Sequence, residues 1–170
     1  MDQVLVAYAS KYGATAGIAE RIGRILREAG LPVEVLPAGK VRDVTPYGAV
    51  VLGSAAYIFH WRREAARLLK ALAAAPSGRP VWLFSSGPTG EGDTDAFPEG
   101  AKVPKGLQPV ADRIAPRDMA VFAGVLDLAK LGWIERFVMN KMQAVPGDYR
   151  DWEAIEAWAR TIAQALQATV

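Results

Sequence analysis

The sequence predicts one α/β domain whose core is a five-stranded parallel sheet with helices on both faces. Three observations predict this fold class. The chain of 170 residues has the length of one ordinary domain, so residues 1–170 are assigned to a single unit. Short apolar runs alternate with longer segments of helical period, which is typical of βαβ units. The composition, 51% hydrophobic and 22% charged, is that of a globular chain that buries its own core.

The five predicted strands are nearly unbroken apolar runs, as expected of parallel strands that are buried on both faces. They are Val4–Tyr8, Val33–Leu36, Gly48–Gly53, Val81–Phe84 and Ala120–Gly124. Because crossover connections are right-handed, two arrangements remain: a doubly wound sandwich with strand order 2-1-3-4-5, or half of a dinucleotide-binding fold. Both bind ligands at the carboxyl ends of the strands, which directs attention to the loops after strands one, three and four.

Three segments carry apolar residues at helical spacing between these strands. The first is Ala14–Ala29, which Gly30 ends, and the second is Trp61–Leu72, with Trp61 at the head of its apolar stripe. The third follows Asp151, which is a good N-cap residue. Its expected core face consists of Trp152, Ile155, Trp158, Ala159, Ile162 and Leu166.

The composition excludes several classes of protein. The chain has no cysteine, which excludes disulfides, thiolate metal sites and iron–sulfur clusters, and its single histidine argues against a zinc site. No metal site is therefore expected. The net charge of +2 is spread among acidic residues rather than gathered into a block, which argues against nucleic acid as a partner. With neither a signal sequence nor a long apolar run, the chain is expected to be cytoplasmic.

The loop after the first strand has the residues that a phosphate site needs. It consists of Ser10, Lys11, Tyr12, Gly13, Ala14 and Thr15. Gly13 would let the backbone curl around an anion at the helix N-terminus, Ser10 and Thr15 would supply hydroxyls, and Lys11 adds positive charge. The alternative is an ordinary turn in which Thr15 caps the helix. A P-loop and the G-x-G-x-x-G fingerprint are both absent, so a mononucleotide phosphate remains as the best ligand.

The loops after the third and fourth strands suit a flat ring. The first of them combines small residues with aromatic ones at Ala55, Ala56 and Tyr57, and His60 follows as a candidate proton donor or surface residue. The second offers exposed amides and hydroxyls and consists of Ser86, Gly87, Pro88, Thr89 and Gly90. The alternative is that the aromatic residues of the first of these loops, Tyr57, Phe59 and Trp61, cap the sheet edge and start the next helix.

Two further segments call for interpretation. The stretch Glu91–Gly106 is too long for a plain connection and is expected to be a functional lid or disordered. Its acidic residues Asp93, Asp95 and Glu99 could bind a hard cation, but a solvated loop surface is the preferred interpretation. The segment Trp133–Met142 has one apolar and one polar face. It is expected to dock on its own sheet; the alternatives are contact with a membrane or the lip of a quinone pocket.

The motifs Y-x-S-K-Y-G-x-T, G-S-A-x-Y-x-x-H-W and F-A-G, at residues 8–15, 53–61 and 122–124, resemble flavodoxin-fold proteins. The subgroup that they resemble is that of menaquinone-dependent protoporphyrinogen oxidase, and the closing stretch from Phe122 to Glu153 is similar to it in order and character. The resemblance implies a flavodoxin-like fold and non-covalent FMN. It places the FMN phosphate at residues 10–15. Residues 55–57 would flank the flavin ring, and residues 86–90 would lie along its pyrimidine edge.

The resemblance also implies a function. It favours oxidation of protoporphyrinogen IX with a quinone acceptor, in heme biosynthesis, and the alternative is a soluble one-electron carrier that serves protein partners. No side chain stands out as a catalytic acid, base or nucleophile. The oxidases carry an insertion before the last helix, and in this chain it is shortened near Val145–Asp148. If that insertion contacts membrane or porphyrin, its shortening argues against the oxidase activity. A peripheral contact with the inner face of a membrane through Trp133–Met142 is part of the same expectation.

Overall fold

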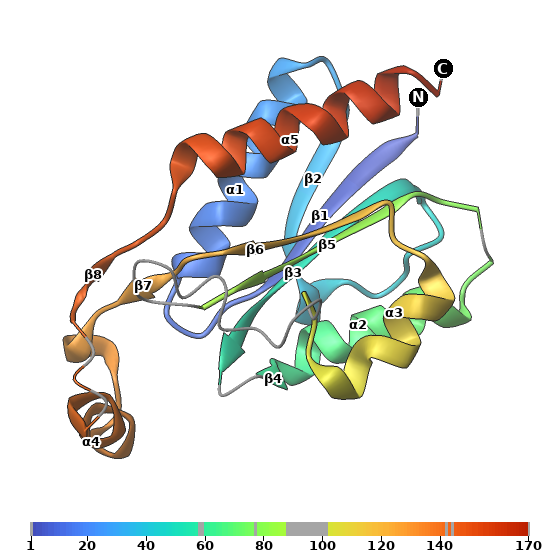
Figure 1. Ribbon diagram of the computed structural model, residues 1–170. Helices are drawn as coiled ribbons and strands as arrows, with labels where there is room; N and C mark the ends of the chain where they lie inside the picture. The colour runs from blue at the N-terminus through green and yellow to red at the C-terminus, as the bar shows by residue number, and fades with distance from the viewer. Residues whose placement is uncertain are drawn as a thin grey trace.

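The computed structural model describes residues 2–57, 60–76, 78–87, 102–141, 143 and 145–169, and its core is a parallel sheet between two layers of helices (Figure 1). The parallel strands are β1 (Gln3–Ala9), β2 (Val33–Pro37), β3 (Tyr47–Tyr57), β5 (Val81–Ser86) and β6 (Asp118–Phe122). They follow the spatial order β2-β1-β3-β5-β6, which is the predicted order. The predicted doubly wound, flavodoxin-like sandwich is therefore confirmed.

Two hydrophobic clusters fill the space between the sheet and its helices. On one face, α1 (Ala14–Glu28) and α5 (Trp152–Gln167) cover a cluster that includes Ile22, Phe84 and Ile155, each completely buried. On the other face, α2 (Arg63–Ala74) and α3 (Gln108–Ile114) cover a cluster around Leu52 and Leu69. Short 3-10 turns lie at η1 (Ala38–Lys40), η3 (Lys105–Leu107) and η4 (Leu128–Lys130). Burial of both sheet faces explains the apolar runs in the central strands, such as Val4–Ala7 of β1 and Val81–Phe84 of β5.

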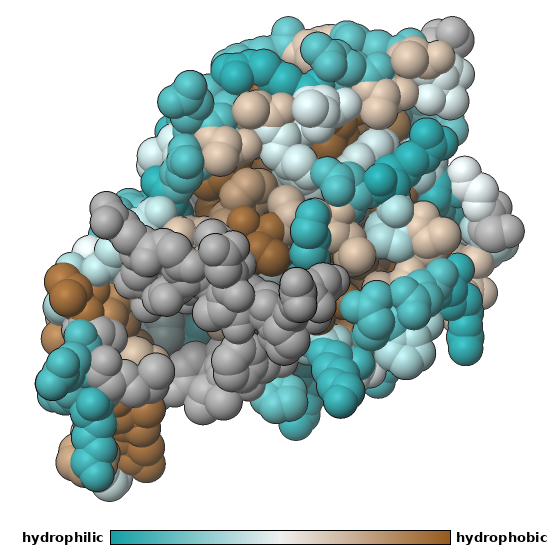
Figure 2. Space-filling view, viewed as in Figure 1, coloured by the Kyte–Doolittle hydropathy of each residue, from teal (hydrophilic) through white to brown (hydrophobic). Residues whose placement is uncertain are grey.

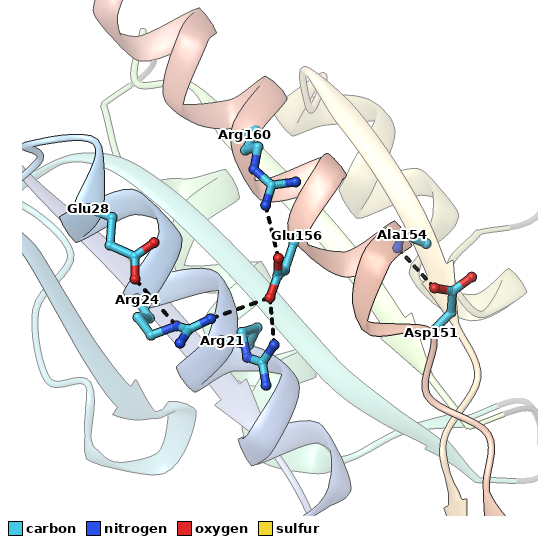
Figure 3. Close-up of polar contacts among 7 residues, drawn as sticks. All are labelled: Arg21, Arg24, Glu28, Asp151, Ala154, Glu156 and Arg160. Atoms are coloured by element: carbon cyan, nitrogen blue, oxygen red, sulfur yellow. Dashed lines mark hydrogen bonds and ion pairs between the residues drawn. The ribbon is translucent and has the colours of Figure 1, made fainter.

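Helices α1 and α5 lie side by side and are joined across their solvent edge by one carboxylate (Figure 3). Glu156 of α5 accepts from Arg21 at 2.5 Å and from Arg24 at 3.3 Å, both on α1. Its second oxygen accepts from Arg160 one turn further along α5, at 2.9 Å. The N-cap predicted for α5 is confirmed, because the Asp151 side chain accepts from the Ala154 amide at 3.0 Å.

Three segments differ from the sequence-based expectations. Trp61 does not start a helix: it lies in β4 (His60–Trp61), which pairs antiparallel with the end of β3, and α2 begins two residues later. Its side chain is buried in the hydrophobic cluster beneath α2. The indole N–H, which needs a partner there, donates to the Ser85 hydroxyl at 2.8 Å. Residues 91–101 lie outside the described part, but the end of the stretch 91–106 is fixed. Val103 is fully buried there, and the Lys102 carbonyl accepts from Ser85 at 2.8 Å.

The third difference is an arm between β6 and α5. Its stalk is a two-stranded antiparallel sheet of β7 (Val125–Leu126) and β8 (Gly147–Asp148), and its tip carries η4 and α4 (Trp133–Lys141). Figure 1 shows α4 at the lower left, outside the two helical layers. The prediction that this helix docks on its own sheet is wrong, since none of its residues is buried.

Candidate functional site

The N-terminus of α1 is open to an anion. Gly13 is its N-cap residue and adopts φ +93°, a left-handed conformation that favours glycine. The Ser10 hydroxyl oxygen accepts from the Gly13 amide at 3.0 Å and fixes this turn. No side chain caps the helix, so the amides of residues 14–16 have no acceptor among the described residues. The alternative in which Thr15 caps the helix does not occur.

A cavity of about 210 Å³ lies against this turn and joins all three loops that the sequence singled out. Its lining includes the predicted residues Ser10, Lys11, Tyr12, Ala14, Thr15, Ala55, Ala56, Ser86 and Gly87. Gly13 shapes the turn without lining the cavity. Pro88, Thr89, Gly90 and the side chain of Tyr57 lie outside the part that the structure describes. The loops are brought together because they follow adjacent parallel strands, as expected at the carboxyl edge of such a sheet.

Two hydroxyls of the cavity lining are open to a ligand. Thr15 and Ser86 line the cavity, and neither hydroxyl makes a hydrogen bond with a described residue. They are not among the fully buried polar atoms that lack a partner, so each can bond a polar group inside the cavity.

Three backbone segments lie close together beside the cavity. A Cβ at Gly87 would lie 2.5 Å from the Ala56 carbonyl oxygen, and a Cβ at Gly124 would lie 3.4 Å from the Gly87 Cα. The ends of β3 and β5 and the turn after β6 can therefore approach one another only because glycine stands at positions 87 and 124.

Two side chains of the first loop bond a carboxylate of the arm. The ammonium group of Lys11 and the hydroxyl of Tyr12 both bond the carboxylate of Glu135 on α4. These hydrogen bonds, that of Lys11 foremost, hold the pKa of Glu135 below its usual value. The same contact raises the pKa of Lys11 above its usual value.

Sequence reasoning missed five residues that line the cavity: Arg62, Gly124, Val125, Leu126 and Leu131. Gly124 belongs to a motif already noted, but no local signal marks the others, because three of them come from the arm. Met139 also lines the cavity, and it lies in the segment 133–142 for which the lip of a pocket was one of the alternatives. Arg62 follows β4 and its amide donates to the Ser54 hydroxyl at 3.0 Å. His60 is exposed and does not line the cavity. Asp93, Asp95 and Glu99 lie outside the described residues, and those that are described offer no acidic or histidine cluster for a metal.

The family follows from a comparison with known families. A family model described as a flavodoxin domain matches residues 5–152. The chain belongs to the flavodoxin domain family. FMN is the cofactor of flavodoxins, and the arrangement here fits it: the uncapped amides and the Thr15 hydroxyl suit a phosphate, and the small lining residues Ala55, Ala56 and Gly87 leave room for a flat ring.

Solved structures share this flavodoxin fold. A Streptococcus pneumoniae flavodoxin is 18% identical over 99% of both chains, with a TM-score of 0.64. A Fusobacterium nucleatum flavodoxin mutant with bound flavin mononucleotide is 20% identical, over 71% of this chain and 68% of that one, with a TM-score of 0.52. Rubredoxin oxygen:oxidoreductase from Desulfovibrio gigas is 18% identical over 99% of this chain and 37% of that one, with a TM-score of 0.65. The comparison with curated protein sequences found no significant match.

Proposed function

We propose that this chain binds FMN non-covalently in the cavity at the carboxyl edge of the sheet and serves as a flavodoxin-type electron carrier. One observation carries the proposal: a single cavity joins the open N-terminus of α1 to the ends of β3 and β5. The amides of residues 14–16 and the hydroxyls of Ser10 and Thr15 would hold the phosphate. Lys11 lines the same end of the cavity, where its ammonium group is paired with the Glu135 carboxylate, so its charge is compensated.

The remaining residues of the site would orient the ring. Ala55, Ala56 and Tyr57 would flank the isoalloxazine, and residues 86–90 would lie along its pyrimidine edge. Bound FMN supplies the electron transfer, so the chain needs no nucleophile or general base of its own. The protein contributes binding, orientation and a partly apolar wall that limits the access of water.

A second candidate is oxidation of protoporphyrinogen IX with a quinone acceptor, as in the oxidase subgroup that the motifs resemble. The apolar side of the cavity favours it, because Val125, Leu126, Leu131 and Met139 of the arm extend the wall beyond the phosphate loop. A flat, apolar electron donor or acceptor would find contacts there that a carrier for protein partners does not need.

The two candidates differ in where the protein works. No helix in the described part of the chain is long and apolar enough to span a membrane. A carrier would act in the cytoplasm, whereas exchange with a quinone would bring the protein to the inner face of the membrane, with residues 133–142 as the contact.

The test is the visible absorption spectrum of the purified protein, titrated first with FMN and then with protoporphyrinogen and a menaquinone analogue. The carrier proposal expects a bound-flavin spectrum that is inert to both compounds but is reduced by a protein donor. A spectrum that bleaches with the porphyrinogen and recovers with the quinone would establish the oxidase instead. If excess FMN produces no bound flavin, both candidates fail.

A further inference from the structure

The outer face of α4 carries four of the five large hydrophobic side chains that are exposed among the described residues. Trp133 is 80% exposed, and the other side chains of this face are Ile134, Phe137 and Val138. They recur at spacings of one and four residues, which places them on one side of the helix. Figure 2 shows brown hydrophobic and teal hydrophilic side chains next to one another at the lower left, where Figure 1 places α4. Such a face needs a partner.

The inner face of the same helix is held by the body of the protein. Glu135 is bonded by Lys11 and Tyr12 of the first loop, and Met139, one turn later, lines the cavity. Lys130 just before the helix donates to the Tyr12 carbonyl at 3.5 Å. The direction in which the outer face points is therefore set by the cavity wall.

The charges around the outer face identify the partner. Glu135 is the only acidic residue between positions 128 and 147, and its ion pair with Lys11 neutralises it. Lys130, Arg136 and Lys141 meet no carboxylate among the described residues. Arg136 donates to the carbonyls of Leu128 and Leu131, and the Lys141 ammonium lies 5.0 Å over the Phe137 ring. The tip of the arm thus combines aromatic and aliphatic side chains with three uncompensated cations.

We propose that α4 is a docking element for an anionic lipid bilayer, with Trp133, Ile134, Phe137 and Val138 entering the interface and Lys130, Arg136 and Lys141 contacting lipid headgroups. Tryptophan and phenylalanine on one face of a cationic helix are typical of helices that lie in a membrane interface. A second copy of the chain fits less well. The tip offers no free carboxylate for another copy's cations, and nine residues of helix cover less than the roughly 800 Å² per partner of a stable interface.

The contact would also bring the proposed redox site to the membrane surface. Because Leu131 and Met139 line the cavity from the inner side of the arm, a bilayer on the outer face would be separated from the cavity by α4. This role of the contact rests on the proposed function, whereas the contact with lipid does not.

The experiment measures flotation of the FMN-loaded protein with vesicles of phosphatidylcholine alone or with 30% phosphatidylglycerol, at low and high salt. Three variants are compared with the natural chain: K130Q/R136Q/K141Q, W133S/F137S, and the control R63Q/R67Q/K70Q. The control removes the same charge from three exposed positions on α2, none of which makes an ion pair in the described residues.

Binding to the anionic vesicles that weakens with salt is expected for the natural chain and the control. The triple variant on the arm should bind roughly 100-fold more weakly, at about fivefold per cation, and W133S/F137S should also lose binding. Absence of binding to anionic vesicles, or equal binding by the two triple variants, would overturn the proposal. Self-association that W133S/F137S abolishes, without vesicle binding, would assign the face to a second copy instead. Flavin absorbance in the same samples reports FMN binding separately, so failure of the proposed function is visible on its own.

Discussion

Thr15 offers the most direct residue-scale test of the proposed phosphate site, because it lines the cavity and its hydroxyl bonds no described group. We expect Thr15→Ala to weaken FMN binding by about 1–3 kcal/mol, the cost of one lost hydrogen bond to a charged group. Binding of riboflavin, which has no phosphate, should not change. Thr15→Ser should keep FMN affinity, since it keeps the hydroxyl. Titration by flavin fluorescence measures all three.

The control lies far from the cavity. Thr161→Ala removes a hydroxyl that donates to the Trp158 carbonyl at 2.7 Å on α5, and it should leave both flavins bound as before. If Thr15→Ala weakens FMN and riboflavin equally, the hydroxyl supports the fold rather than the phosphate. If neither affinity changes, Thr15 is not part of the site.

Residues differed in how far the sequence could predict their place. The turn formed by Ser10, Gly13 and Thr15 was predictable because it is local: a glycine, two hydroxyls and a helix start occur within six residues. Leu131 was not, because it reaches the cavity only where the arm packs back against the first loop. Arg62 gave no signal either, since its position depends on the short pairing of β4 with β3.

At the scale of elements, strands were predicted better than connections. Runs such as Val81–Phe84 need burial on both faces, and a parallel sheet is the structure that supplies it. The helical period of α4 was equally clear, but periodicity shows only that a face is apolar, not what covers it. Trp61 illustrates the same limit, because a buried indole suits a helix stripe and a two-residue strand alike.

The contact between α1 and α5 gives a pH prediction at this scale. Hydrogen bonds and ion pairs with Arg21, and then with Arg160, hold the pKa of Glu156 below its ordinary value of 4.5. A carboxylate with a lowered folded pKa stabilises the protein above pH 4.5, and this contribution is lost as the pH falls through the folded pKa. Glu156→Gln should therefore lower Tm by about 1–4 °C at pH 7 and by less at pH 3, which lies below the ordinary pKa.

The matched control for this measurement is Glu28→Gln on α1. Glu28 is 59% exposed and makes one contact of 3.6 Å with Arg24, so its loss should change Tm less at either pH. Thermal unfolding followed by circular dichroism at the two pH values decides the point. A Tm difference for Glu156→Gln that persists unchanged at pH 3 would show that its carboxylate is not the stabilising group.

For the whole molecule, a ligand that binds the folded state raises Tm. Substitutions at the two ends of α1 can therefore show whether its N-terminal turn takes part in FMN binding. Gly13 at the start and Gly30 after the end both adopt positive φ, at +93° and +85°, and at neither would a Cβ meet an atom within 4 Å. Replacing either residue with alanine should therefore cost about 1 kcal/mol of backbone strain and lower Tm by about 2–4 °C. Only Gly13 belongs to the proposed phosphate turn.

Saturating FMN separates the two substitutions. At 100 times its Kd, a ligand stabilises the native state by about 2.7 kcal/mol, which at this chain length corresponds to a rise in Tm of about 5–10 °C. We expect the natural chain and Gly30→Ala to show that rise, and Gly13→Ala to show a smaller one, because relief of its strain moves the amides that hold the phosphate. Equal rises in both variants would remove the turn from the site. The absence of a rise in the natural chain would contradict FMN binding, because a ligand that binds only the folded state must stabilise it.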